Sequence, residues 1–128
     1  MSDPIVYVDR SQIRAGKIDE VKAAMKELTE FADANEPQLI SYGFFLAEDE
    51  TRMTCIAVHP DSASLGFHMD VAGPVFRKFR GLIDMERIDV YGPVHGELID
   101  VVKQKAEMLG RGNVIIHHRH VGFSRFAD

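Results

Sequence analysis

The fold class of this 128-residue chain follows from the stretch LISYGFFLAEDETRMTCIAV, residues 39–58. β-Branched and aromatic residues dominate 39–47 and 53–58, which is typical of strands. The connection 48–52 is short and polar. A polar connection of this length between two strand-like segments predicts a β-hairpin near the middle of the chain.

The hairpin is preceded by a strand and a helix. Residues 5–8 are β-branched and aromatic, which predicts a strand. In 17–34 apolar residues recur every three or four positions, which predicts a helix with one buried side. These apolar residues are Ile18, Val21, Met25, Leu28, Phe31 and Ala32. Pro37 ends the helix because the residue before a proline is pushed out of the helical region.

A second helix and a fourth strand are expected after the hairpin. Asp61 or Ser62 is a good N-cap for the helix. The Gly73-Pro74 pair interrupts the helix, and a short continuation is expected through Phe79. Residues 86–91 have the apolar alternation of a strand.

The resulting order is βαββαβ, the ferredoxin-like plan of an α+β domain. We assign 1–94 to this domain. Residues 95–128 form a C-terminal extension of the same domain, with a helix at 95–109 and a strand at 114–123. Gly110 occupies the position of a helix C-terminal stop.

Composition excludes several function classes. The net charge of −5 argues against binding to nucleic acid or to an anionic membrane surface. RNA-recognition modules share the βαββαβ order, but their aromatic signature is absent from this sequence. A single cysteine, Cys55, excludes an internal disulfide, and no apolar run is long enough to span a bilayer. We therefore expect a cytoplasmic protein.

Three local stretches, in this order, carry a resemblance. A strand leads into a Gly-Lys helix start at 7–17, and an acidic, proline-containing approach to a Ser-Tyr pair covers 36–42. The third stretch is 59–61, followed by His68 in the first turns of a capped helix. Together with the βαββαβ order, they resemble the dimeric α+β barrel superfamily and, within it, the antibiotic-biosynthesis-monooxygenase-like group.

The resemblance implies oxidation of an aromatic or polycyclic substrate in a hydrophobic pocket, without a bound metal or flavin. The haem-degrading branch of this group uses an asparagine, a tryptophan and a histidine, at positions that correspond here to Asp9, His59 and His68. Only His68 matches in residue type. The chain has no tryptophan, which argues against haem degradation.

His68 is the candidate catalytic base, with Asp9 and His59 as further candidate catalytic residues. Imidazole has an unperturbed pKa of about 6.5, so it exchanges protons near neutral pH. Removing a proton from the substrate gives a carbanion-like form that can pass an electron to oxygen. The alternative is that His68 is a buried helix residue bonded to a backbone carbonyl.

Strand alternation suggests which side chains line a pocket for a small organic molecule. An apolar and aromatic wall with few polar groups is typical of such sites. The candidate substrate-binding residues are Tyr7, Tyr42, Phe44, Arg87, Asp89 and Tyr91. The alternative is that the tyrosines belong to the core and that Arg87 and Asp89 pair at a solvated sheet edge.

No cofactor is expected. His118 and His120 would share one face of the strand at 114–123 and are a possible zinc pair, but no third ligand lies near them in the sequence. Cys55 lies in the middle of a strand without nearby positive charge, which is typical of a buried structural thiol.

The working unit is expected to be a homodimer. Two helices cover one sheet face, and we expect the uncovered face to carry Tyr42, Phe44, Leu46, Met53 and Cys55, too apolar to remain in water. The strand at 114–123 would pair with a sheet edge, either in its own subunit or in the partner. The rival arrangement has the helix at 95–109 covering the open face of a monomer.

Two functions remain open at this stage. One is a cofactor-independent, monooxygenase-like enzyme. The other is a non-catalytic homodimer that binds a metabolite or responds to stress. Fold alone does not decide between them.

Overall fold

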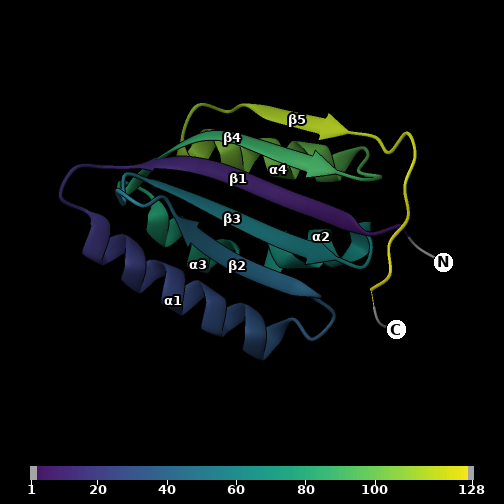
Figure 1. Cartoon of the computed structure of the whole chain (residues 1–128), viewed down its shortest axis with the longest axis horizontal. Helices are drawn as coiled ribbons and strands as arrows, with labels where there is room; N and C mark the ends of the chain where they lie inside the picture. The colour runs from purple at the N-terminus through teal and green to yellow at the C-terminus, as the bar shows by residue number, and fades with distance from the viewer. Residues whose placement is uncertain (1–2, 127–128) are drawn as a thin grey trace.

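A computed structural model describes residues 3–126 and shows one five-stranded sheet covered by helices (Figure 1). The strand order is β2-β3-β1-β4-β5. The strands are β1 (Ile5–Ile13), β2 (Ser41–Leu46), β3 (Arg52–His59), β4 (Ile83–Tyr91) and β5 (Val114–His117). The helices are α1 (Ile18–Asn35), α2 (Ser62–Val71), α3 (Gly73–Phe76), the 3₁₀ turn η1 (Arg77–Phe79) and α4 (Glu97–Leu109).

The predicted ferredoxin-like α+β order is confirmed. β1 lies between β3 and β4, antiparallel to both, and β2 pairs with β3 as the predicted hairpin. Asp61 caps α2, since its Oδ1 accepts a hydrogen bond from the Ser64 N–H at 2.9 Å. Within residues 3–126 no helix has the length and apolar character needed to cross a membrane.

The C-terminal strand is shorter than predicted. β5 ends at His117 instead of residue 123 because its partner β4 ends at Tyr91, directly before Gly92-Pro93. β5 runs parallel to β4 of its own chain, and α4 provides the crossover that a parallel pair needs. The chain after His117 runs along one end of the sheet (Figure 1).

Gly110 follows α4 as predicted, but for a different reason. Its φ of 179° is extended and lies outside the left-handed region. The backbone instead comes so close to β4 that a Cβ at this position would lie 2.1 Å from the Met85 carbonyl oxygen. Only glycine fits this close approach between α4 and the sheet.

The helices all pack against one face of the sheet. α4 lies on the same side as α2 and α3, so the rival arrangement, in which it covers the open face, is wrong (Figure 1). The prediction for the open face is also wrong, because its five named side chains point toward the helices. These side chains are Tyr42, Phe44, Leu46, Met53 and Cys55. Alternation shows which residues share a face but leaves open which face the helices cover.

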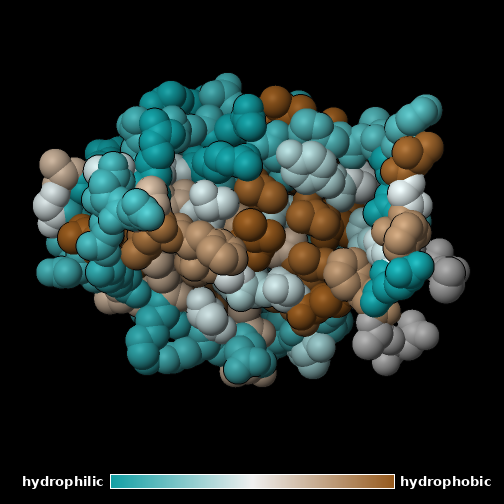
Figure 2. Space-filling model, viewed as in Figure 1, coloured by the Kyte–Doolittle hydropathy of each residue, from teal (hydrophilic) through white to brown (hydrophobic). Residues whose placement is uncertain are grey.

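The open face nevertheless is apolar at its centre. The register places Val8 beside Ile56, and Val6 beside both Val58 and Tyr91. Figure 2 shows apolar side chains gathered over the middle of this face, with hydrophilic side chains around them.

The packing of α1 predicts how two substitutions on its buried side change the free energy of unfolding. Leu28 is 2% exposed and packs against the sheet core, so Leu28→Ala is expected to lower the free energy of unfolding by about 2–5 kcal/mol. Phe31→Ala is expected to cost less because Phe31 is only partly buried. Urea denaturation followed by circular dichroism measures both. The exposed control Asp33→Ala is expected to change the free energy of unfolding by less than about 0.5 kcal/mol. Equal urea midpoints for Leu28→Ala and wild type would contradict the packing of Leu28.

Candidate functional site

Two sets of ionisable side chains are buried between the helices and the sheet. The first is centred on His68, which is 1% exposed, and on Glu36, which is 2% exposed. The His68 Nδ1 lies 2.7 Å from the Glu36 Oε2. Because a carboxylate only accepts hydrogen bonds, Nδ1 donates to Glu36, and in the neutral form of the ring Nε2 has the lone pair that can accept a proton.

Local sequence explains why these two residues meet. Glu36 is the residue after α1, and Pro37 prevents the helix from continuing past it. His68 lies one turn after Ser64 on the buried side of α2, together with Leu65 and Met69. The end of α1 and the buried side of α2 thus bring residues 32 positions apart into contact.

His59 lies next to this pair, with its ring centroid 5.7 Å from that of His68. Its Nδ1 shares a hydrogen bond with the Ser64 Oγ at 2.7 Å, and its Nε2 has no hydrogen-bond partner among the described residues. Burial, followed by the charges of His68 and Lys105, lowers the pKa of His59 to about 3. His59 is therefore neutral at physiological pH and is better suited to positioning α2 than to proton transfer.

The second buried set is centred on Asp9. The Tyr7 hydroxyl donates to the Asp9 Oδ2 at 2.6 Å, and the Lys105 Nζ lies 3.6 Å from the same oxygen. The Asp9 Oδ1 is buried without a hydrogen-bond partner within residues 3–126. Burial is the main reason that the pKa of Tyr7 rises well above its usual value, and the adjacent Asp9 adds to the rise.

Tyr42 connects the two sets. Its ring centroid lies 5.3 Å from that of His68, and its side chain lines the same small cavity as Asp9 and Cys55. Burial, with smaller contributions from Cys55 and Asp9, raises the pKa of Tyr42 well above its usual value. Burial likewise raises the pKa of the Cys55 thiol, so the prediction of an unreactive buried cysteine agrees with the structure.

The free space around these residues is unevenly distributed. The cavity between helices and sheet measures about 10 Å³, because Tyr42, Phe44 and Phe79 fill the interior. A groove of about 540 Å³ runs outside it between α2–α3 and α4. Phe76 and Lys105 line both spaces, so these two side chains separate the groove from the interior.

The structure divides the predicted substrate-binding set between the two faces of the sheet. Tyr7, Tyr42 and Phe44 lie on the helix side with Asp9 and the histidines. The remaining three, Arg87, Asp89 and Tyr91, lie on the open face.

Asp89 is the centre of an ion-pair network on that open face. It is 1% exposed and accepts hydrogen bonds from Arg10 at 3.0 Å, Arg87 at 2.7 Å and His117 at 2.8 Å. Burial opposes its ionisation, but the hydrogen bonds from His117 and Arg87 outweigh burial and hold the pKa of Asp89 below its usual value. Tyr91 stacks on His117 with ring centroids 4.3 Å apart. The alternative in which Arg87 pairs with Asp89 is therefore confirmed for the contact, but the pair lies on β4, between β1 and β5, and not at a solvated sheet edge.

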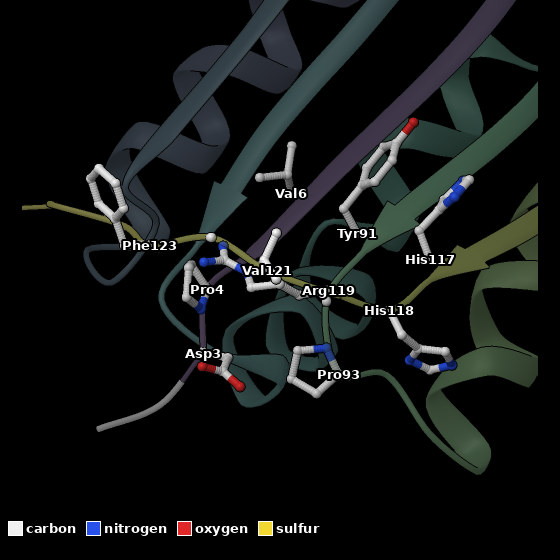
Figure 3. A pocket seen from close by; sticks show the side chains of 12 residues that line it. Asp3, Pro4, Val6, Tyr91, Pro93, His117, His118, Arg119, Val121 and Phe123 are labelled. Carbon is white, nitrogen blue, oxygen red and sulfur yellow. The ribbon is translucent and has the colours of Figure 1, made fainter.

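A hollow of about 460 Å³ lies at one end of the open face, where the chain after β5 crosses it (Figure 3). Tyr91 and His117 stand on one side of it, and Arg119, Val121 and Phe123 come from the crossing segment. The catalytic candidates do not line this hollow. We therefore place the candidate site on the helix side.

No metal site forms among residues 3–126, since no group of three or more His, Cys, Asp and Glu side chains is close enough to hold an ion. His118 and His120 lie beyond the end of β5, so the strand geometry predicted for them is wrong.

Two site residues escaped the sequence prediction. Glu36 stands in one of the three stretches that carry the family resemblance, but an acidic residue beside a helix end is common and does not indicate a buried partner. Lys105 had a clearer signal. It lies on the apolar stripe of α4 with Leu98, Val102 and Leu109, at spacings of three and four. A lysine on such a stripe is buried only if it is paired.

Comparison with solved structures bears on the fold. The structure of MupZ from Pseudomonas fluorescens superposes with a TM-score of 0.75 at 20% identity, covering 97% of this chain and 96% of that one. SnoaB, a cofactor-independent oxygenase from Streptomyces nogalater, superposes with a TM-score of 0.61 at 18% identity, covering 74% and 97%. A Bacteroides thetaiotaomicron protein inferred to be an antibiotic biosynthesis monooxygenase superposes at 0.54 with 19% identity, covering 65% and 85%.

These structures share the ferredoxin-like α+β fold of this chain. The fold implied by the resemblance to the antibiotic-biosynthesis-monooxygenase-like group is thereby confirmed. The likeness to MupZ extends into the C-terminal part of the chain, whereas SnoaB covers about three quarters of it. No family model matches the chain, and no curated protein matches it.

The low pKa of His59 predicts acid sensitivity. Between about pH 6.5 and pH 3 the unfolded chain binds a proton at this residue and the folded chain excludes it, so stability falls as the pH falls. The loss is at most about 1.4 kcal/mol per pH unit. His59→Asn keeps a partner for Ser64 and removes the titration, so its stability is expected to fall less steeply than that of wild type between pH 6.5 and 5.

Urea unfolding at several pH values measures this difference. The exposed variant His120→Asn serves as the control and is expected to follow wild type. Parallel pH curves for His59→Asn and wild type would show that His59 does not resist protonation in the folded protein.

Proposed function

We propose that this chain is a small-molecule enzyme that oxidises an aromatic or polycyclic substrate with molecular oxygen, without a resident metal or flavin. The buried contact between Glu36 and His68 carries this proposal. The carboxylate of Glu36 holds the buried imidazole of His68 in one orientation, and an imidazole held in this way is the usual arrangement of a general base. The shared fold with SnoaB, a cofactor-independent oxygenase, supports the same reaction class.

In this proposal Glu36 orients the ring and His68 is the base. The Nε2 takes a proton from an activated C–H or O–H group of the substrate and leaves a resonance-stabilised anion. The anion carbon gives electrons to O₂, a C–O bond forms, and protonated His68 returns its proton to the peroxide. For a CH₂ group, loss of water from the hydroperoxide leaves a carbonyl group, so one O₂ yields one carbonyl oxygen and one water.

The interior must open for this chemistry. Tyr42, Phe44 and Phe79 leave a cavity of about 10 Å³, room for about one water molecule. Tyr42, whose ring centroid lies 5.3 Å from that of His68, has to rotate away together with the two phenylalanine rings before a planar substrate can approach. Ligand-gated side-chain motion of this kind is a common step in enzyme action.

The filled interior also favours the second candidate function, a non-catalytic homodimer. A protein of this kind would bind its metabolite outside the helix-covered layer, for example in the open-face hollow of about 460 Å³. It would consume no oxygen with any substrate.

Oxygen uptake with a panel of hydroquinones and anthrones distinguishes the two functions. We expect the wild type to accelerate uptake, His68→Ala to lower the rate at least about 100-fold, and Glu36→Gln to have a smaller effect because the ring is still held. His118→Ala is a matched control, since it removes an exposed histidine outside the site. Equal rates for His68→Ala and wild type, or a rate equal to the buffer blank for the wild type, would sink the oxygenase proposal.

We further propose that the working unit is a homodimer joined through the open sheet face. The apolar centre around Val8, Ile56 and Val58 is shielded from water when a second copy covers it, and two-fold pairing of identical faces is the commonest assembly. The neighbouring exposed side chains Phe45 and Ile115, which are 57% and 42% exposed, would enlarge the contact.

Light scattering tests the dimer. The wild type is expected at twice the mass of the chain, and Ile56→Glu at the mass of one chain, because an unpaired carboxylate would be buried in the interface. Ala23→Glu adds the same charge on an exposed position of α1 and is expected to leave the dimer intact. A wild type with the mass of one chain at micromolar concentration rules the dimer out.

A further inference from the structure

Lys105 is an unusual side chain in the helix-covered layer. The residue is 5% exposed, and its ammonium lies 4.8 Å from the centroid of the Tyr7 ring and 4.5 Å from that of Phe76. Its ion-pair partner is Asp9, at 3.6 Å, which is too long for a good hydrogen bond. The ammonium makes no hydrogen bond to another described residue, and it is not among the fully buried polar atoms without a partner, so its donors reach the solvent side.

This arrangement differs from an ordinary buried salt bridge. In such a pair the ammonium donates directly to the carboxylate and the other donors are satisfied nearby. Here the Tyr7 hydroxyl takes the close position on the Asp9 Oδ2, at 2.6 Å. Asp9 thus neutralises Lys105 from the sheet side but leaves its donors free for another acceptor.

The free donors lie at the boundary of a groove large enough for a ligand. The groove between α2–α3 and α4 measures about 540 Å³, within the range of small-molecule sites. Phe76, Leu98 and Val101 supply apolar and aromatic surface, and Lys105 lies on the side nearest the interior. The other charged residues of the groove, Asp70, Arg77 and Glu97, are exposed to solvent.

We propose that this groove binds a planar aromatic anion, with its carboxylate, phenolate or enolate oxygen on the Lys105 ammonium and its ring against Phe76. A charge-assisted hydrogen bond to a partly desolvated ammonium is stronger than one in water, which gives the anionic form its advantage. Only the expected aromatic body of the ligand rests on the proposed function.

The test compares 2-naphthoate with the uncharged 2-naphthamide by isothermal titration calorimetry under nitrogen. The wild type is expected to bind the carboxylate at least about tenfold more tightly than the amide. Lys105→Met keeps the length of the side chain and removes the charge, and it is expected to abolish the preference. Lys103→Met removes an exposed lysine of the same helix and is expected to retain it.

Methionine methyl resonances locate the ligand. Met69 and Met108 line the groove, whereas Met25 lies on the buried side of α1, outside the groove. 2-Naphthoate is expected to shift the first two resonances and leave that of Met25 unchanged. Val101→Trp, which fills the groove from an exposed position, is expected to weaken binding at least tenfold.

Lys105→Met leaves the Asp9 carboxylate unpaired in the interior, which lowers the stability of that variant. The double variant Asp9→Asn, Lys105→Met removes both charges and is expected to fold and to show no preference for the carboxylate. Equal wild-type affinity for the two probes, no wild-type binding of 2-naphthoate, or a shift confined to Met25 would overturn the inference.

The outcome is independent of catalysis. Lys105-dependent binding of 2-naphthoate by a protein that consumes no oxygen supports the groove site and removes the oxygenase proposal. Oxygen uptake by a protein that does not prefer 2-naphthoate supports the oxygenase proposal and overturns the groove site.

Discussion

One-sided coverage of the sheet is the constraint on which the rest of the structure depends. Every helix packs on the same face, so a single layer must take all the apolar side chains that the helices and strands bury there. Glu36, His68, Asp9 and Lys105 lie in that layer as well. Ionisable groups at this depth are tolerated because each one faces a partner of opposite charge or a hydrogen-bonding group.

The two buried pairs differ in how completely they are satisfied. His68 and Glu36 are in direct contact at 2.7 Å, which holds the ring in one orientation. Lys105 and Asp9 are 3.6 Å apart, and the second Asp9 oxygen has no partner within residues 3–126. An apolar pair of the same volume would stabilise the fold at least as well, so stability alone does not explain either pair. The proposed proton transfer at His68 and the proposed anion binding at Lys105 would account for them.

The open face of the sheet differs from the helix-covered layer. It combines an apolar centre with the network in which Arg10, Arg87 and His117 surround Asp89. In the network two arginines share one carboxylate, so it keeps a net positive charge, whereas apolar side chains are gathered at the centre of the face (Figure 2). The helix-covered layer thus holds the candidate chemistry, and the open face is suited to association.

The sequence by itself determined the order of elements, the ends of α1 and α2, and the residues that share each strand face. These properties depend on periodicity, caps and prolines, which act within a few residues. The resemblance also named His68, Asp9 and His59 as candidate catalytic residues, and the structure buries all three on the helix side of the sheet. The tertiary structure alone decided which face the helices cover, that β5 pairs with its own β4, and that Glu36 and Lys105 complete the site. The apolar stripe of α4 indicates that Lys105 is buried, but no local pattern indicates its partner or that of Glu36, because these partners are 96 and 32 positions away and meet only where the helices cross the sheet.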